Sequence, residues 1–207
     1  MSARPIIIDC DPGQDDAVAL FLAMSSPDEL EILGITAVAG NVPLCLTERN
    51  ARVMCDVAGR RDIPVYAGAE KPLIRKAISA EYIHGETGIN GMDVFEPETP
   101  LQSQYAVDFL LETLAAAAPA SITLVPTNIA SAFITDPQVI ENIAEIVLMG
   151  GAMREGGNRT PSAEFNILAD PHAADIVFSC GRPLTVMGLD VSHKVLSTPE
   201  RVSRIRE

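Results

Sequence analysis

The sequence has few cationic side chains, few cysteines and no long hydrophobic run. Its 207 residues include 15 Lys and Arg against 28 Asp and Glu, which gives a net charge of −13 at pH 7. Nucleic-acid binding needs clustered Lys and Arg, so this balance argues against a nucleic-acid partner. The chain opens without a basic segment followed by an apolar core, and no apolar run reaches the length of a membrane span. We therefore expect neither a nucleic-acid partner nor a membrane partner.

The four cysteines are too few for a disulfide scaffold, and they lack the spacing of a zinc finger. We expect them to be reduced, buried thiols in a cytoplasmic protein. Hydrophobic residues make up 47% of the chain, and no low-complexity tract interrupts it. A chain of this length and composition is long enough to bury one sizeable core. A single domain over residues 1–207 is the expectation.

An apolar run near the N-terminus ends in a cluster of carboxylates. Residues 6–8 are three isoleucines, which predict a buried strand, and a Pro-Gly pair at positions 12 and 13 ends that strand with a turn. Side chains alternate along a strand, so Asp9 and Asp11 are expected to point to the same side. Two carboxylates should therefore leave the strand tip together.

Two more carboxylates, Asp15 and Asp16, follow in the first turn of an expected helix, where the helix dipole favours negative charge. Four carboxylates within residues 9–16, without a His or Cys chelating pattern, suit a hard cation such as Ca²⁺ or Mg²⁺ rather than zinc. The alternative is that Asp15 and Asp16 are ordinary helix-start residues. That alternative does not account for Asp11, because a buried strand tip is a poor place for an unpaired charge.

Strand and helix patterns alternate along the rest of the chain. Strands are expected at residues 30–40, 63–68, 122–125, 146–149 and 184–188, and helices at residues 15–24, 46–58, 102–118, 137–144 and 171–180. This alternation predicts an α/β fold with an open, mostly parallel Rossmann-like sheet and helices on both faces. Gly, Pro and charged residues interrupt the pattern between residues 71 and 100. A loop of that length in a compact domain is usually functional.

Polar residues and glycines follow several of the expected strands. Asp11, Asn41, Thr127, Gly150 and Asp190 each lie where an apolar strand ends. Open α/β sheets bind their ligands at the carboxyl ends of the strands. We therefore expect one ligand site at that edge of the sheet.

The opening stretch resembles the inosine-uridine-preferring nucleoside hydrolases. The signature of that family, Asp-x-Asp-Pro-Gly-x-Asp-Asp after an apolar strand, is complete over residues 9–16. Further stretches that resemble the family lie at residues 38–41, 84–85, 146–151 and 158–166. The resemblance covers nearly the whole chain in the family's order. It implies the nucleoside hydrolase fold and calcium-dependent hydrolysis of the N-glycosidic bond of ribonucleosides to ribose and free nucleobase.

The resemblance also implies a role for each matching residue. Asp11 and Asp16 match ligands of a Ca²⁺ ion, and Asp11 is expected to act as general base on the attacking water. His84 matches a histidine near the nucleobase that assists its departure, and the alternative is an exposed loop histidine. The remaining matches are to ribose contacts and lie at Asp15, Asn41, Asn158, Glu164 and Asn166.

Two departures from the family pattern affect these expectations. The family's turn Val-Pro-Thr-Gly-Pro-Leu-Thr-Asn-Ile-Ala is shortened by four residues at positions 125–130, where Thr127 matches either threonine. A threonine carbonyl of this turn is a calcium ligand in the family, so the resemblance assigns Thr127 to the metal. The family also continues with a His-Asp pair that contributes a site histidine and a calcium ligand. We therefore expect a domain that is incomplete at its C-terminus, with a tail from Thr198 that frays.

Three functional hypotheses remain open. The first is a nucleoside hydrolase whose activity the truncation reduces or abolishes. The second is a haloacid-dehalogenase-type phosphatase that uses Asp9-x-Asp11 with Mg²⁺, although Gly13 and the Asp15-Asp16 pair do not fit that family. The third is a non-catalytic fragment. For the first hypothesis, the resemblance further implies a small ribonucleoside as the partner and a dimer or tetramer as the assembly.

Overall fold

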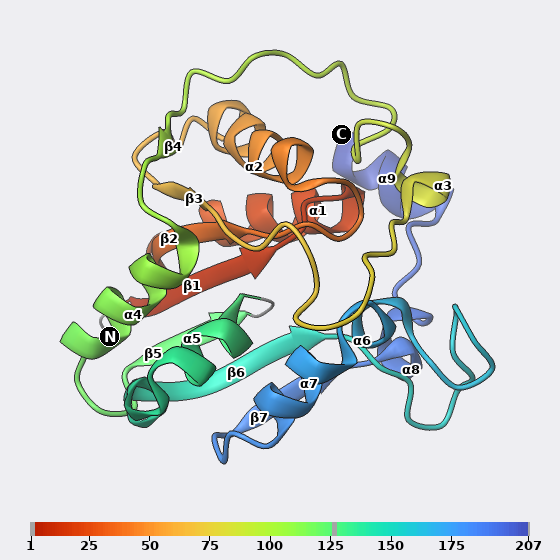
Figure 1. Cartoon of the computed structure of the whole chain (residues 1–207). Coiled ribbons are helices and arrows are strands. Elements are labelled where there is room, and N and C mark those ends of the chain that lie inside the picture. The colour runs from red at the N-terminus through yellow and green to blue at the C-terminus, as the bar shows by residue number, and fades with distance from the viewer. Residues whose placement is uncertain (1–2, 126–127, 207) are drawn as a thin grey trace.

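The computed structural model describes residues 3–125 and 128–206, and it contains a seven-stranded sheet (Figure 1). The strands are β1 Arg4–Cys10, β2 Leu30–Ala37, β3 Val65–Ala67, β4 Leu101–Gln102, β5 Ile122–Val125, β6 Ile143–Met149 and β7 Leu184–Met187. Their order is β4-β3-β2-β1-β5-β6-β7, and every neighbouring pair is parallel. The expected open Rossmann-like sheet is confirmed. Because the chain builds outward from β1 in one direction and then returns to β5, the topological switch point lies between β1 and β5.

Helices connect these strands and cover the sheet. They are α1 Gln14–Met24, α2 Leu44–Val57, α3 Glu81–His84, α4 Ala106–Ala116, α5 Ile129–Thr135, the 3₁₀ helix η1 Pro137–Asn142, α6 Phe165–Ala169, α7 Pro171–Phe178, α8 Leu189–Ser192 and α9 Pro199–Arg206. Two of them begin at an Asp-Pro pair, in which the aspartate side chain caps the helix. Asp136 accepts a hydrogen bond from the amide of Gln138 at 3.0 Å, and Asp170 accepts one from the amide of Ala173 at 3.1 Å.

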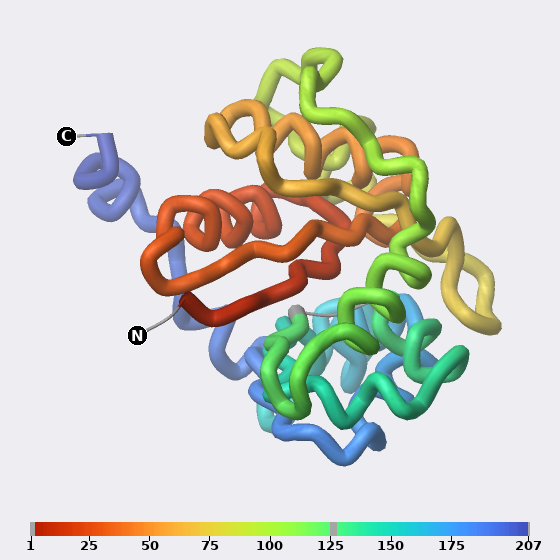
Figure 2. The backbone as a smooth tube through the Cα atoms, turned by 90° about the vertical axis from the view of Figure 1, so that its left-hand side faces the viewer, coloured from red at the N-terminus to blue at the C-terminus, as the bar shows by residue number. Residues whose placement is uncertain are grey.

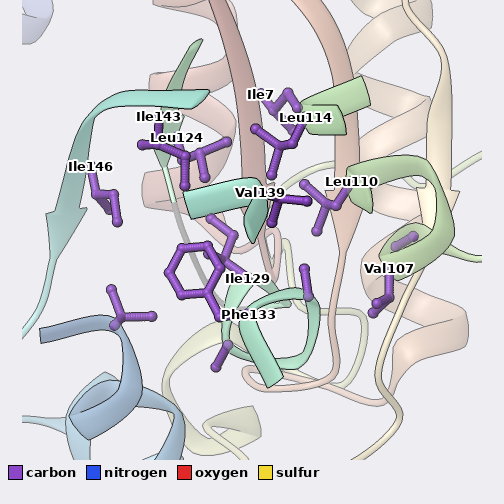
Figure 3. Close-up of a cluster of buried hydrophobic side chains, with 14 of the residues drawn as sticks. Ile7, Val107, Leu110, Leu114, Leu124, Ile129, Phe133, Val139, Ile143 and Ile146 are labelled. Atoms are coloured by element: carbon purple, nitrogen blue, oxygen red, sulfur yellow. The ribbon is translucent and has the colours of Figure 1, made fainter. Parts of the chain in front are cut away.

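The alternation of side chains along the sheet divides the core into two clusters. Ile7 belongs to a cluster with α4, α5 and α7, which Figure 3 shows in close-up around Leu110, Leu124 and Phe133. Ile6 and Ile8 point to the other face and pack with residues of α1 and α2. The buried isoleucine strand of the sequence prediction is thus packed on both faces, which is typical of a parallel sheet covered by helices.

The largest differences from the predicted elements concern short elements. Strand β4 and helices α5, α6 and α8 were not predicted, and α3 interrupts the region expected to be a loop. The helix expected over residues 137–144 is a 3₁₀ helix that ends at Asn142, because Ile143 already begins β6. Elements of two to seven residues carry too few apolar repeats to establish a period.

The second half of the sheet is covered unequally. Ile146 and Leu148 are buried among the residues of the α5 and α7 side. Met149 and Met187, which are paired on β6 and β7 and lie next to the buried positions, are 41% and 42% exposed.

Helix α9 is exposed along its length and stands away from the rest of the chain in Figure 2. None of the helices in the described ranges is both long and apolar enough to cross a membrane.

Candidate functional site

A cavity of about 540 Å³ lies at the carboxyl ends of the strands. One side is formed by the segments that follow β1, β2 and β3, and the other side by the end of β6 and by α6 with the loop before it. The cavity is lined by every sequence-predicted site residue in the described ranges, namely Asp11, Asp15, Asp16, Asn41, His84, Asn158, Glu164 and Asn166. Thr127, the remaining predicted metal ligand, lies outside the described residues. The expected ligand-binding edge is therefore a cavity at the switch point, although Gly150 and Asp190, which the strand-end pattern also placed there, are not among its lining residues.

The carboxylate of Asp11 is held by the turn that follows β2. The backbone amide of Asn41 donates to Asp11 Oδ2 at 2.7 Å, and Asn41 Nδ2 donates to the carbonyl oxygen of Asp11 at 2.8 Å. Gly40 allows this approach, because a Cβ at that position would lie 2.1 Å from Asp11 Oδ2. Through these two hydrogen bonds Asn41 fixes the orientation of the Asp11 carboxylate. The predicted role of Asn41 as a sugar contact would be additional.

Asp16 lies in the first turn of α1, and its Oδ2 accepts a hydrogen bond from the amide of Gly13 at 3.0 Å. Burial raises the pKa of Asp16 to about 7, and the neighbouring Asp15 charge adds to the shift. Burial likewise raises the pKa of Asp11 well above its usual value, and the charge of Asp16 adds to it. Burial therefore disfavours the charged form of both carboxylates, and the hydrogen bonds from the nearby backbone amides offset this only in part.

Asp9 is part of a buried network beneath the cavity. Its Oδ1 accepts hydrogen bonds from Thr36 Oγ1 and Asn128 Nδ2, both at 2.7 Å, and the backbone amide of Asn128 donates to Oδ2. Asn128 Oδ1 accepts in turn from the amide of Ala69 at 2.8 Å. Burial raises the pKa of Asp9 to about 7 despite these donors. The sequence carried no signal for this network, because Asp9 and Asn128 are 119 positions apart.

His84 is held against the start of α1. Its Nδ1 lies 2.5 Å from Oε1 of Gln14, and Gln14 Nε2 donates to the carbonyl of Asn90 at 3.3 Å. Gly13 makes room for the ring, since a Cβ there would lie 2.5 Å from His84 Nδ1. His84 is partly buried and lines the cavity, so it is not an exposed loop histidine. Gln14, which orients it, was not recognised from the sequence.

The opposite wall is organised by Glu164, which caps the N-terminus of α6. Its carboxylate accepts from the amides of Gly151 and Asn166 at 2.9 Å and from the amide of Ile167 at 3.2 Å, and the residue is only 2% exposed. Asn158 Oδ1 accepts from the amide of Phe165 at 2.9 Å, which places its Nδ2 as the donor for a ligand. This wall therefore presents a negative charge that is stabilised by a helix N-terminus.

The comparison with known families identifies the chain. The family model described as inosine-uridine preferring nucleoside hydrolase matches residues 6–207. The chain belongs to this family. It is 48% identical over 210 residues to the pyrimidine-specific ribonucleoside hydrolase RihB of Escherichia coli, and 46% identical over 210 residues to the inosine-uridine preferring nucleoside hydrolase of Leishmania major. Each alignment covers 99% of this chain and 66% of the relative, so the chain spans about two thirds of their length.

Solved nucleoside hydrolases share the fold. The purine-preferring ribonucleoside hydrolase from Gardnerella vaginalis superposes with a TM-score of 0.91 at 34% identity, covering 98% of this chain and 66% of that one. A plant nucleoside hydrolase superposes with a TM-score of 0.84 at 36% identity, covering 93% of this chain and 62% of that one. The predicted nucleoside hydrolase fold is therefore confirmed over nearly all of the chain.

The oxygen atoms that line the cavity are the kind of ligand that a hard divalent cation prefers. Within the described ranges, no group of three or more His, Cys, Asp and Glu side chains is arranged to hold a metal ion. Asp11 and Asp16 nevertheless offer carboxylate oxygens, and a bound cation would offset the burial that raises the pKa of both groups. Ca²⁺ takes six to eight oxygen ligands. Asp11 and Asp16 would therefore hold it together with water or substrate oxygens.

Proposed function

We propose that this protein hydrolyses the N-glycosidic bond of ribonucleosides in a Ca²⁺-dependent reaction that releases ribose and the free nucleobase. The observation that carries the proposal is the arrangement of the cavity, with Asp11 and Asp16 on one wall and Asn158, Glu164 and Asn166 on the other. Its volume of about 540 Å³ lies within the range of about 300–1,000 Å³ that is typical of small-molecule sites. Family membership supports the reaction class.

Asp11 is the proposed general base. When bound, Ca²⁺ supplies positive charge that makes a water molecule more acidic. Asp11 accepts the proton of the attacking water as its oxygen bonds to the anomeric carbon and the C–N bond breaks. Burial raises the pKa of Asp11, which increases its affinity for that proton. The hydrogen bond from the Asn41 amide keeps the carboxylate oriented during the transfer.

The wall around α6 is proposed to stabilise the sugar. Cleavage of a glycosidic bond places positive charge on the ring in an oxocarbenium-like transition state. The buried carboxylate of Glu164 faces the cavity with a fixed negative charge, because three backbone amides already hold it in place. Asn158 and Asn166, with Asp15 and Asn41 opposite, are the proposed partners of the ribose hydroxyls. A pre-oriented site of this kind lowers the barrier without reorganisation.

The nucleobase leaves with the electron pair of the C–N bond and needs a proton. His84 is the proposed donor. Because Gln14 Oε1 is an acceptor, it binds a protonated Nδ1, and His84 would donate from Nε2 towards the leaving base only when that nitrogen also carries a proton. In this assignment His84 donates a proton to the leaving nucleobase, whereas Asp11 accepts a proton from the attacking water.

The test uses the purified full chain with inosine and with uridine, and it measures ribose release with a reducing-sugar assay. We expect release in millimolar Ca²⁺ and none in EDTA. Asp11→Asn should reduce kcat by about 10²–10⁴-fold, the usual contribution of a general base. Asp28→Asn, an identical change at an exposed acidic residue, should leave the rate unchanged. A folded protein that releases no ribose in Ca²⁺ would reject hydrolysis and support the non-catalytic hypothesis.

The phosphatase hypothesis receives no support, because the nucleoside hydrolase family model runs through residues 6–207. A cytoplasmic location and a dimeric or tetrameric assembly remain part of the proposal. All four cysteines are free thiols, but only Cys10 and Cys55 are buried as expected, whereas Cys45 is exposed and Cys180 is half-buried. Light scattering coupled to size-exclusion chromatography tests the assembly.

A further inference from the structure

Two side chains not yet discussed join the two walls of the cavity. Tyr82 lies on α3, two positions before His84, and Arg159 directly follows Asn158. Arg159 Nη1 donates a hydrogen bond to Tyr82 Oη at 3.0 Å, across 77 positions of sequence. The guanidinium carbon also lies 5.1 Å from the centroid of the Tyr82 ring. The contact therefore combines a hydrogen bond with a cation–π interaction.

The same guanidinium contacts the cavity wall itself. Its carbon lies 6.0 Å from the centroid of the Phe165 ring, and Phe165 is 8% exposed and lines the cavity. Arg159 thus touches one aromatic ring on each side of the cavity. A planar guanidinium stacks on rings and donates hydrogen bonds at the same time, which the point charge of a lysine does less well.

The two partners are anchored very differently. The loop that carries Arg159 is fixed at its base by Asp190, which accepts from the amides of Met153 at 2.7 Å and Arg154 at 3.0 Å. Helix α3 is a single turn in which Tyr82 is 63% exposed. Glycines follow it at positions 85 and 88, with φ angles of +77° and +83°. Arg159 therefore reaches from a fixed loop to the exposed middle of a one-turn helix whose ends are held elsewhere, by the Ala80 amide on the Asn41 carbonyl at 2.9 Å and by His84 on Gln14.

We propose that Arg159 and Tyr82 are positioning residues for the ligand in this cavity. Their contact holds Tyr82 and Ile83 of α3 against the wall that carries Asn158 and Phe165, whereas Gln14 separately holds His84. Breaking the contact lets Tyr82 and Ile83 move away, so that the ligand loses the contact with Ile83 while His84 and the carboxylates at β1 and α1 stay in place. The identity of the ligand, a ribonucleoside, rests on the proposed function, whereas the effect on α3 does not.

Amide hydrogen exchange of the full chain without ligand tests the contact directly. We expect Arg159→Met, which keeps the length of the side chain but removes its charge, to speed exchange at residues 80–85 by about tenfold, because it removes a hydrogen bond and a cation–π contact. Tyr82→Phe keeps the ring and should show a smaller increase. Arg154→Met, in the same loop and exposed, is the matched control and should leave exchange at residues 80–85 unchanged. Unchanged exchange in Arg159→Met would overturn the proposal.

Kinetics with inosine and uridine distinguish positioning from a purely structural role. Arg159→Met should raise KM by about tenfold, equivalent to about 1.4 kcal/mol of binding free energy, and change kcat by less than about threefold. Adding Tyr82→Phe to Arg159→Met should cause no further loss, because the two residues act through one contact. A fall in kcat at unchanged KM, or additive losses, would overturn the proposal. If the wild-type chain is inert, inosine affinity measured by calorimetry replaces KM, and only the proposed hydrolysis fails.

Discussion

The backbone amide of Asn41 donates a 2.7 Å hydrogen bond to Oδ2 of Asp11, although the two residues are 30 positions apart. They follow adjacent parallel strands, β1 and β2, whose carboxyl ends meet at the same edge of the sheet. The turn after β2 therefore sets the direction of the carboxylate after β1. Mutations in that turn should affect the chemistry of Asp11 without changing a predicted catalytic or substrate-contacting residue.

Gly40→Ala tests this relationship. A Cβ at residue 40 would lie 2.1 Å from Asp11 Oδ2, so the carboxylate must move. We expect kcat/KM for inosine to fall by about 100-fold, because misplacing a catalytic group by about 1 Å has an effect of that size. The rise in melting temperature on adding Ca²⁺ should also become smaller. A variant with unchanged kcat/KM and an unchanged response to Ca²⁺ would show that Asp11 does not depend on this turn.

Gln14→Leu tests the orientation of His84. Gln14 Oε1 lies 2.5 Å from His84 Nδ1, and leucine is similar in size but cannot accept that hydrogen bond. We expect kcat to fall by about tenfold, because a misaligned acid transfers its proton less effectively. In steady-state assays, Gln14→Leu combined with His84→Ala should be no slower than His84→Ala alone. A further loss in the double variant would mean that Gln14 acts independently of His84.

Asn128→Asp tests the network beneath the cavity. Asn128 Nδ2 donates to Asp9 Oδ1 at 2.7 Å, and aspartate would replace that donor with a second buried carboxylate. We expect the free energy of unfolding at pH 8 to fall by about 3–5 kcal/mol, the usual effect of leaving a buried charge uncompensated. Urea denaturation followed by circular dichroism measures the change. Thr123→Ser, a buried polar position elsewhere on the sheet, is a milder comparison and should cost much less.

Asp56 organises a second set of hydrogen bonds, remote from the cavity. It accepts from the amides of Glu98 at 2.6 Å and Thr99 at 3.1 Å, from Thr99 Oγ1 at 2.7 Å, and from Arg61 at 2.8 Å. Burial pushes the pKa of Asp56 upward, but the Thr99 hydroxyl, the Glu98 amide and Arg61 outweigh it and hold the pKa below the ordinary value of 3.8. The stabilisation is therefore fully present above pH 3.8, and it is lost as the pH falls through the lowered pKa.

Asp56→Ala should lower the free energy of unfolding at pH 7 by about 1–3 kcal/mol, because it leaves the buried Thr99, which is 1% exposed, without its acceptor. The difference from the wild type should shrink as the pH is lowered below 3.8, where the wild-type carboxyl group becomes protonated. Thermal unfolding across a pH series measures both effects. A difference that stays constant down to pH 2 would show that the charge of Asp56 is not what stabilises the segment at Glu98 and Thr99.

The sequence alone determined the sheet and the edge at which the site lies. Three isoleucines followed by Asp-x-Asp-Pro-Gly specify a buried strand with carboxylates at its tip, because side-chain alternation and turn chemistry act over a few residues. Asp-Pro pairs at residues 136 and 170 likewise mark the starts of η1 and α7. These local rules predicted the carboxylates at the strand tip, whereas His84, Asn158, Glu164 and Asn166 were predicted only from the family resemblance.

The tertiary structure decided what each of those residues touches. Asp9 meets Asn128 across 119 positions, His84 meets Gln14 across 70 and Arg159 meets Tyr82 across 77. Each contact depends on the path of a loop that has no apolar period, so no local pattern predicts it. Glu164 illustrates the same point, since its carboxylate caps α6, a five-residue helix too short to be recognised from the sequence. Local chemistry placed the carboxylates at the strand tip, the family resemblance marked the other site residues, and long-range packing set the orientation of all of them.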